Sequence, residues 1–227
     1  MRLRHQLRRL LFAVGWHLSG RTLQRIDNSL NYLAAAHWAR SRNLHRVPAF
    51  ADRCRLFERI ADDVAPQPTL YLEFGVYQGD SMRVWSRLLK HPRSVLHGFD
   101  SFQGLPEDWT SEMPRGHFST DGAMPVIDDP RVRLFKGWFD DVLPGYQLPQ
   151  HDRLVVSLDA DLYSSTKYVL DWLRPHMAVG AYLYFDEFCH RHHEMKAFSE
   201  FQQATGMEFE AIGQSRCWEH AAFRRVR

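Results

Sequence analysis

The sequence predicts an α/β protein: a Rossmann-like, seven-stranded, mostly parallel sheet with an antiparallel edge hairpin, preceded by an N-terminal helical arm. From residue 70 onward, short apolar runs alternate with helical patterns, as a parallel sheet with right-handed crossovers requires. Two of these runs, 153–163 (RLVVSLDADLY) and 181–188 (AYLYFDEF), are nearly continuous and end in acidic residues. Such runs are typical of strands that are covered on both faces. Before residue 70, apolar residues recur at helical spacing instead.

The composition is that of a globular protein, but its charge is unevenly distributed. In this chain of 227 residues, 44% are apolar and 25% are charged, and the net charge is +2. Residues 1–50 contain nine Arg and one Asp, which leaves 20 basic and 26 acidic residues in the remainder. Because that remainder is acidic, a long groove that tracks nucleic-acid phosphates is disfavoured, and we expect no nucleic-acid partner.

Cysteine usage and hydropathy bear on location. Cys54, Cys189 and Cys217 are an odd number without C-x-x-C spacing, so a disulfide framework is disfavoured and a reducing compartment is favoured. The apolar segment 10–16 is far too short to cross a bilayer, and no small-residue cleavage site follows it. We therefore expect a cytoplasmic protein, which would be peripheral at a membrane if its first helix lies on the surface.

Residues 1–66 are expected to form the helical arm. Within it, residues 1–26 place leucines at helical spacing with arginines between them, the pattern of a basic amphipathic helix. Such a helix could lie on an anionic membrane surface, pack on its own domain, or pack on a second subunit in a homo-oligomer. Further helices are expected over 27–39 and 49–64, the latter bounded by Pro48 and Pro66.

Residues 67–227 are expected to form the main domain. The last two strands are separated only by 215–220 and should form an antiparallel hairpin. The segment 101–129 is rich in Gly, Pro, Ser and Asp and leaves the end of a strand, which predicts a lid loop. Trp38, Trp85 and Trp172 are expected in the core. The predicted strands are 70–74, 95–100, 132–137, 154–159, 181–185, 209–214 and 221–226, and the predicted helices are 81–90, 164–174 and 193–205.

Four acidic residues follow two of the strands: Asp159, Asp161, Asp186 and Glu187. The carboxyl ends of neighbouring parallel strands open into one crevice, so these side chains are expected to converge. The alternative is that they cap the following helices, whose free N–H groups stabilise carboxylates. Two acidic pairs on neighbouring strands favour a functional site.

The first strand of the domain runs into a glycine-containing turn, EFGVYQGDS (73–81). Glycines there let a ligand approach the backbone, and Asp100, which ends the next strand, could accept hydrogen bonds from both hydroxyls of a ribose. The spacing is not the G-x-G-x-x-G of dinucleotide sites, and no P-loop Lys-Ser/Thr follows. An adenosine-type ligand without a pyrophosphate, S-adenosylmethionine, fits better than NAD. The alternatives are a plain helix-capping turn, an NAD(P)-dependent oxidoreductase on the same fold, and a non-catalytic membrane-surface assembly module.

Four stretches of the chain match a known family: YLEFGVYQGDS (71–81), GFDSFQGLPEDW (98–109), LDADLYSSTKYVL (158–170) and YFDEF (184–188). They resemble the macrocin O-methyltransferase family, whose members methylate sugar hydroxyls in macrolide and aminocoumarin antibiotics. The resemblance covers about 70–226 and leaves the basic arm outside. It implies a cofactor site along the turn and the two following strand ends: Glu73, Gly75 and Gly79 at the methionine end, Asp100 and Ser101 at the ribose, and Gly137 and Trp138 near the adenine. Val76, Tyr77 and Ser81 of the turn are also expected to contact the cofactor.

The resemblance also implies a magnesium site formed by Asp159, Asp186 and Glu187, the last standing where the family commonly has Asp. The predicted reaction is S-adenosylmethionine-dependent methylation of a hydroxyl on a small-molecule or glycan acceptor, a sugar, glycoside or secondary metabolite. Alignment alone can supply ~7–11 kcal/mol, and a hard cation would stabilise the developing alkoxide. Asp159 is the expected base.

His190, or His192 in its place, is a second candidate for the base. The same segment, with Cys189 and His193, has zinc-type ligand residues but not the spacing of a tetrahedral site, and a solvated helix start explains it equally well. In the lid, His117 and Phe118 could contact a sugar ring.

Overall fold

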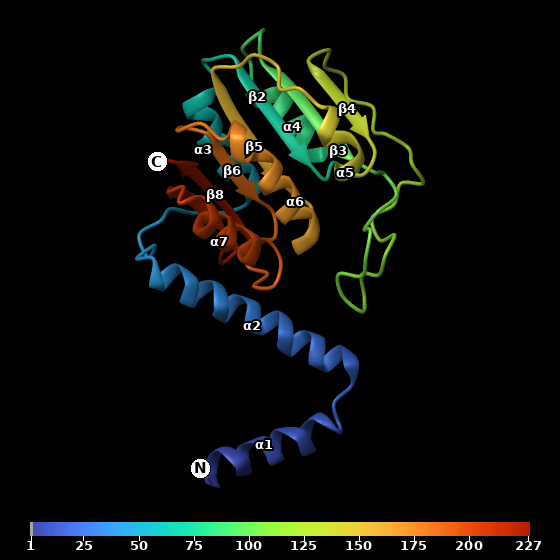
Figure 1. The fold of residues 1–227 in the computed structure, drawn as a ribbon, viewed down its shortest axis with the longest axis vertical. Coiled ribbons are helices and arrows are strands. Elements are labelled where there is room, and N and C mark those ends of the chain that lie inside the picture. The colour runs from blue at the N-terminus through green and yellow to red at the C-terminus, as the bar shows by residue number, and fades with distance from the viewer. Residues whose placement is uncertain (1) are drawn as a thin grey trace.

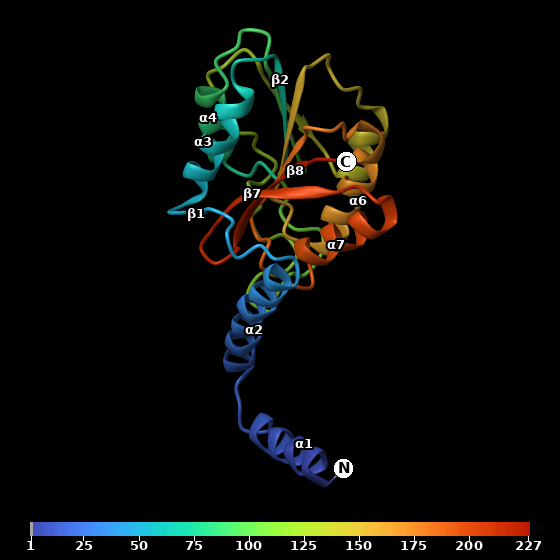
Figure 2. The same cartoon turned by 90° about the vertical axis from the view of Figure 1, so that its left-hand side faces the viewer.

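The computed structural model describes residues 2–227, and within them eight strands form one sheet in the order β1-β7-β8-β6-β5-β2-β3-β4. Figures 1 and 2 show helices on both faces of this sheet, α3 and α4 on one side and α6 and α7 on the other. The elements are α1 (Arg2–Gly15), α2 (Gly20–Ser41), β1 (Ala49–Phe50), α3 (Arg53–Val64), β2 (Thr69–Phe74), α4 (Asp80–Leu88), β3 (Val95–Asp100), β4 (Val132–Lys136), α5 (Phe139–Val142), η1 (Leu143–Gly145), β5 (Arg153–Leu158), α6 (Tyr163–Leu173), η2 (Arg174–His176), β6 (Tyr182–Phe185), α7 (Glu194–Thr205), β7 (Phe209–Ser215) and β8 (His220–Arg225).

The predicted fold class is confirmed. Strands β2 to β6 are parallel to one another, and β8 runs antiparallel to both β6 and β7, as the hairpin requires. The sheet has one strand more than predicted, because β1 pairs in parallel with β7 outside the hairpin. The helix expected from residue 49 begins only at Arg53, where the Asp52 side chain accepts a hydrogen bond from Arg55 N at 3.0 Å and caps the first turn.

The helix predicted over residues 1–26 is wrong in its extent, because two helices occupy this region. Helix α1 ends at Gly15, and α2 begins after Ser19, whose hydroxyl accepts a hydrogen bond from Thr22 N at 3.2 Å. Glycine is a weak helix former and serine is a preferred N-cap residue, so the chain stops and restarts the helix here. Helix α2 then continues through the region 27–39 without interruption.

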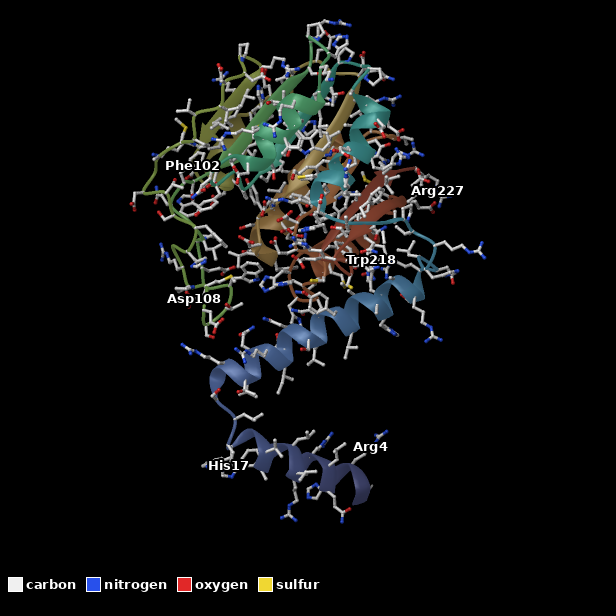
Figure 3. The ribbon with its side chains drawn as sticks, turned by 180° about the vertical axis from the view of Figure 1, so that it is seen from behind. Arg4, His17, Phe102, Asp108, Trp218 and Arg227 are labelled. Atoms are coloured by element: carbon white, nitrogen blue, oxygen red, sulfur yellow. The ribbon has the colours of Figure 1, made fainter. Side chains whose placement is uncertain are left out.

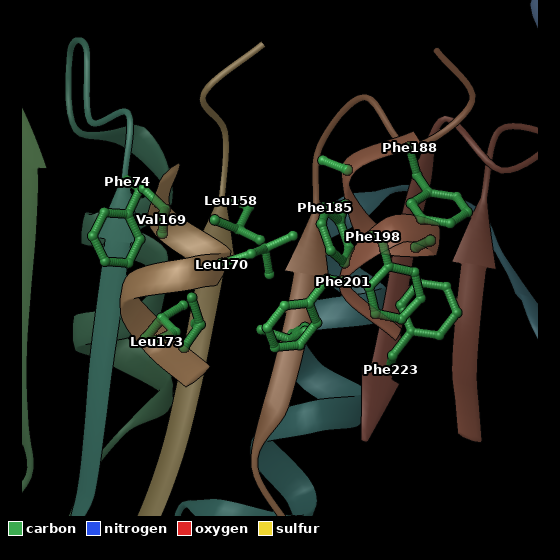
Figure 4. Close-up of a cluster of buried hydrophobic side chains, with 14 of the residues drawn as sticks. Phe74, Leu158, Val169, Leu170, Leu173, Phe185, Phe188, Phe198, Phe201 and Phe223 are labelled. Atoms are coloured by element: carbon green, nitrogen blue, oxygen red, sulfur yellow. The ribbon is translucent and has the colours of Figure 1, made fainter. Parts of the chain in front are cut away.

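The sheet is buried on both faces by two clusters of apolar side chains. In β2, Leu70, Leu72 and Phe74 belong to the cluster under α6 and α7, whereas Tyr71 points to the opposite cluster and stacks on Trp85 of α4 at 4.8 Å. Successive side chains of a strand face opposite sides, so one strand serves both clusters. Figure 4 shows the first cluster, where phenylalanines from β6, α7 and β8 gather beside leucines and a valine of β5 and α6.

Two of the elements expected in the arm pack with the sheet. Helix α3 buries Leu56, Phe57 and Ile60 in the cluster on the α4 side, and β1 lies in the sheet itself. Helix α2 packs through Trp38, which is buried and whose ring lies 4.8 Å from that of Phe188. Trp85 is also buried and Trp172 partly so. Helix α1 projects away from the body (Figure 1).

Candidate active site

The ends of β2 and β5 are pressed together at Gly75. This residue has φ +91°, and a Cβ built on it would lie 1.7 Å from the carbonyl oxygen of Asp159. Backbone hydrogen bonds hold the contact, from Gly75 N to Phe99 O at 3.0 Å and from Asp159 N to Phe74 O at 2.9 Å. Only glycine accommodates both the dihedral angle and this approach. The glycine turn is therefore fixed directly beside the acidic strand end.

Two cavities, of about 500 Å³ and 220 Å³, share Gly75, Asp159 and Asp161 in their walls. The larger has the size of a small-molecule site. Eight of the ten predicted cofactor residues line one or both: Gly75, Ser101, Gly137 and Trp138 line the larger cavity, and Glu73, Gly75, Val76, Tyr77 and Ser81 line the smaller.

Asp100 and Gly79 are the two predicted cofactor residues outside these linings. The Asp100 carboxylate accepts hydrogen bonds from Val76 N and Tyr77 N, both at 2.8 Å, and from Phe102 N at 2.7 Å. A carboxylate has about four acceptor positions, so roughly one is left for a ligand hydroxyl. Gly79 has φ +79° and precedes the first turn of α4. Both residues therefore set the shape of the turn.

Three carboxylates converge at the shared wall. Asp159, Asp161 and Glu187 each offer one oxygen atom, and these atoms lie within 4.8 Å of one another. Glu187 Oε2 is buried without a hydrogen-bond partner. Asp161 has φ +58°, an uncommon value for a residue with a side chain. Such an outlier beside a cavity indicates a functional constraint on the backbone.

Asp186, which the sequence assigns to the metal site, lies on the same edge but is neutralised by other groups. Arg53 Nη1 lies 3.2 Å from its Oδ2, His220 Nδ1 lies 3.3 Å from its Oδ1, and the Tyr184 hydroxyl donates to it. Burial raises the pKa of Asp186, but the hydrogen bond and charge of His220 and the charge of Arg53 outweigh burial and hold that pKa below its usual range. The structure thus brings Asp161 into the three-carboxylate group and pairs Asp186 with Arg53 and His220.

Burial raises the pKa values of several acidic side chains around the two cavities. Burial, reinforced by neighbouring carboxylates, raises the pKa of both Asp159 and Glu187 well above the usual range. Burial also raises the pKa of Asp161 to about 7 and that of Glu73 to about 8. Such groups must retain protons or gain a cation. Closely spaced carboxylate oxygens, one of them without a partner, suit a hard cation such as Mg²⁺, so the donor set fits the predicted metal.

Two charged residues beside these groups are absent from the sequence-based assignment. Glu194 is fully buried: its Oε2 accepts a hydrogen bond from Glu187 N at 3.0 Å and its Oε1 has no partner. In the sequence it looks like an ordinary acid in the first turn of a helix. Arg53 lines the smaller cavity from the start of α3, more than 100 residues upstream of its partner Asp186, and no local pattern marks it.

His190, the second candidate base, is not found among the described residues that line the two cavities. Its ring lies 5.0 Å from that of Trp109, and burial lowers its pKa to about 4. Within residues 2–227, the group of His, Cys, Asp and Glu side chains with metal-ligand spacing is the three-carboxylate group alone. The neighbouring histidines and cysteine therefore form no zinc site in the described chain.

The predicted lid segment lies over both cavities. Phe118 lines the smaller cavity and packs against Tyr77, with ring centroids 5.7 Å apart, and Leu105 and Arg115 line the larger. His117 lines neither cavity in the described chain, although its ring lies 4.4 Å from that of Phe118. In Figure 3, Phe102 marks the part of this segment near the body and Asp108 marks its outlying loop.

This sheet order, with a glycine turn beside an acidic strand end, is that of the Rossmann-like methyltransferases. Among solved structures, that of the O-methyltransferase NovP has a TM-score of 0.62 and 26% sequence identity, over 77% of this chain and 80% of the other. The structure of CalS11, a calicheamicin methyltransferase, has a TM-score of 0.59 at 22% identity, over 75% of this chain and 76% of the other.

The model of the macrocin O-methyltransferase family matches residues 51–216, and the chain belongs to that family. A tetracenomycin-pathway rhamnosyl 4'-O-methyltransferase of Streptomyces olivaceus is 31% identical over 153 residues, which are 57% of this chain and 55% of that protein. Demethyldecarbamoylnovobiocin O-methyltransferase of Streptomyces niveus is 40% identical over 138 residues, 52% of each chain. The chain spans about half the length of the curated relatives it matches.

Proposed function

We propose that this protein transfers a methyl group from S-adenosylmethionine to a hydroxyl of a sugar, glycoside or secondary metabolite. The observation that carries the proposal is the shared wall of the two cavities, where Gly75, Asp159 and Asp161 stand between a larger and a smaller space. Two curated relatives are named for methylation at numbered sugar positions, 4' and 3''. The nucleoside of a methyl donor in the larger space and its methionine end in the smaller one would bring the methyl group to that wall, where an acceptor hydroxyl would meet it.

The larger cavity suits the nucleoside part of the methyl donor. Ser101, Gly137 and Trp138 would contact ribose and adenine there, and the remaining acceptor position of Asp100 would serve a ribose hydroxyl. Gly75 and Glu73 would receive the methionine end. Because Glu73 is buried with a raised pKa, the positive charge of the donor would favour ionisation of this carboxyl.

The three-carboxylate group would hold a divalent cation, for which Mg²⁺ is the best match to the oxygen donors. When bound, the cation would lower the cost of losing the proton of the acceptor hydroxyl. We assign the ligands to Asp159, Asp161 and Glu187, with Asp186 held by Arg53 and His220. The sequence-based set differs by having Asp186 instead of Asp161, and matched Asn variants at these two positions separate the alternatives.

The protein's own groups would align the acceptor and accept its proton. Asp159 lies on the shared wall, where its carboxylate could accept the proton directly or through a water. Phe118 and Tyr77 offer aromatic faces in the smaller cavity, where a sugar ring could pack. The lid carrying Phe118 would limit the entry of water, which competes for the same positions.

Two measurements test the proposal. S-adenosylhomocysteine should raise the melting temperature whereas NAD should not, because the turn lacks a pyrophosphate site. Labelled methyl groups should then pass from S-adenosylmethionine to a component of a glycan or metabolite fraction, and Asp159→Asn should abolish the transfer. Stabilisation by NAD alone would favour the oxidoreductase, and no response to either ligand would favour a non-catalytic module.

A further inference from the structure

Helix α1 presents large apolar side chains to solvent. Leu10 and Leu11 are each 61% exposed, Phe12 is 71% exposed, and Trp16, just beyond the helix, is 77% exposed. Figures 1 and 2 show the helix apart from the body in both views. Within residues 2–227, no helix is both long and apolar enough to cross a membrane. These exposed apolar side chains therefore indicate that the helix packs against another surface.

The charge of α1 indicates which surface that is. The helix contains four Arg and no acidic residue. At 100° per residue, Leu7, Leu10, Leu11 and Val14 fall within an arc of about 100°. Arg4 flanks one side of this arc, and other basic residues lie opposite it. A narrow apolar stripe bordered by arginines is the pattern of helices that lie in the headgroup region of anionic membranes.

Helix α2 extends the apolar surface. Its face toward the body buries Asn31, Ala35, Trp38 and Ala39. A second stripe on the same helix is at least 43% exposed and follows spacings of three and four residues: Leu23, Ile26, Leu30 and Leu33. Helix α2 thus has two apolar sides. One packs against the body, and the other has no partner in the described chain.

We propose that α1, together with the exposed stripe of α2, binds the surface of a membrane rich in anionic phospholipid. A second copy of the chain is the less favourable occupant. In a symmetric pair the same patch faces itself, and two α1 helices would bring eight arginines together without an acidic residue between them. An anionic lipid surface instead attracts each arginine near it, and tryptophan, here Trp16, is a residue enriched at membrane interfaces.

Docking through the arm would also orient the site. Arg191, in the segment after β6, donates to the Asp27 carbonyl at 3.1 Å and to its carboxylate at 2.5 Å. Arg21 approaches Glu112 of the lid at 4.0 Å. Helix α2 is thus joined to the segment after β6 and to the lid, and Figure 1 shows it along the side of the body that carries α7. A bound arm would hold the lid side of the body toward the membrane.

Vesicle co-sedimentation of the full-length protein tests this proposal. The vesicles contain either phosphatidylcholine alone or phosphatidylcholine with phosphatidylglycerol, at about 0.1 M and about 1 M salt. The variants are R4Q/R8Q/R9Q in α1, L7Q/L10Q in the same helix, and R87Q/R93Q/R174Q as a matched control that removes three exposed arginines from the body. Circular dichroism and analytical ultracentrifugation establish that each variant is folded and report its oligomeric state.

We expect binding to phosphatidylglycerol vesicles that weakens at high salt, and little binding to neutral vesicles. Each arginine near an anionic surface contributes about fivefold to affinity, so the α1 triple variant should bind roughly 100-fold more weakly. The leucine variant should also lose binding, and the control triple should retain it. Equal loss in the control triple would overturn the proposal. The proposal would also be overturned if the protein did not bind vesicles but formed a dimer, and the leucine variant dissociated that dimer. A second copy of the chain would then occupy the surface.

Discussion

Replacement of Glu73 by Gln should remove a large pH dependence from the stability of the ligand-free protein. The Glu73 side chain is 1% exposed, and Oε2 accepts a hydrogen bond from the Tyr71 hydroxyl at 2.8 Å. Burial, aided by the charges of Asp186 and Asp100, raises the pKa of Glu73 from 4.5 to about 8, against the opposing effects of Tyr71 and Arg53. The native protein therefore keeps a proton that the unfolded chain has lost between these two pH values.

The sign follows from proton linkage. Where the native state binds more protons than the unfolded state, the free energy of unfolding falls as pH rises. Stability that depends on the protonated carboxyl is fully present below about pH 4.5 and declines until the pH passes about 8. One pKa unit corresponds to about 1.4 kcal/mol, so the decline attributable to Glu73 is at most about 5 kcal/mol. Gln keeps an oxygen that can accept the Tyr71 hydrogen bond and does not ionise.

Urea denaturation at pH 5 and pH 9, with a chelator present, measures this difference. We expect wild type to lose several kcal/mol more than Glu73→Gln between these pH values, in agreement with the linkage estimate. Glu58→Gln is the matched control, because the Glu58 side chain is 46% exposed and pairs with Arg55 at 2.7 Å on the surface of α3. If wild type and Glu73→Gln lost stability in parallel, the assignment of a buried, protonated Glu73 would be refuted.

Three other predictions concern the site and the arm. Gly75→Ala should destabilise the protein by more than about 2 kcal/mol, because its Cβ would collide with the Asp159 carbonyl; Gly145→Ala, with open space around it, is the control in the same denaturation assay. Asp161→Asn should weaken Mg²⁺ binding in calorimetry at least about tenfold, and a larger effect of Asp186→Asn would instead support the sequence-based ligand set. Trp38→Ala removes a buried ring against Phe188, worth about 3–5 kcal/mol, and limited proteolysis should then cleave α2 while the body stays resistant.

The sheet could be predicted because its strands carry their own signal. The buried runs over β2, β5 and β6 are continuous and apolar, and acids mark where two of them end, so those strands lie within a residue or two of their predicted bounds. Strand β1 has only two residues, and its partner β7 lies some 165 residues away. A pairing of that kind leaves no periodic pattern. The break between α1 and α2 depends on one capping hydroxyl, that of Ser19, which is a weak signal within a helical pattern.

The sequence could predict where the candidate site lies, but not which of its side chains pair with one another. Acids at the ends of β5 and β6 were expected to converge, and Asp159, Asp161 and Glu187 do so. Which carboxylate would be neutralised depends on Arg53 and His220, which reach Asp186 from distant parts of the chain. The periodicity of the sequence describes each helix or strand separately, so it cannot reveal that a basic side chain of one element pairs with an acid of another.

Hydrogen bonds of Arg191 connect helix α2 to the short backbone segment that follows β6 and carries Glu187. That segment begins at Glu187, one of the three carboxylates, and four residues later Arg191 donates hydrogen bonds to Asp27 and Asn31 of α2. Any displacement of α2 must either break these bonds or pull on the segment that carries Glu187. Because linkage is reciprocal, any change that fixing α2 makes in cation affinity would be matched by an equal effect of a bound cation on the position of α2.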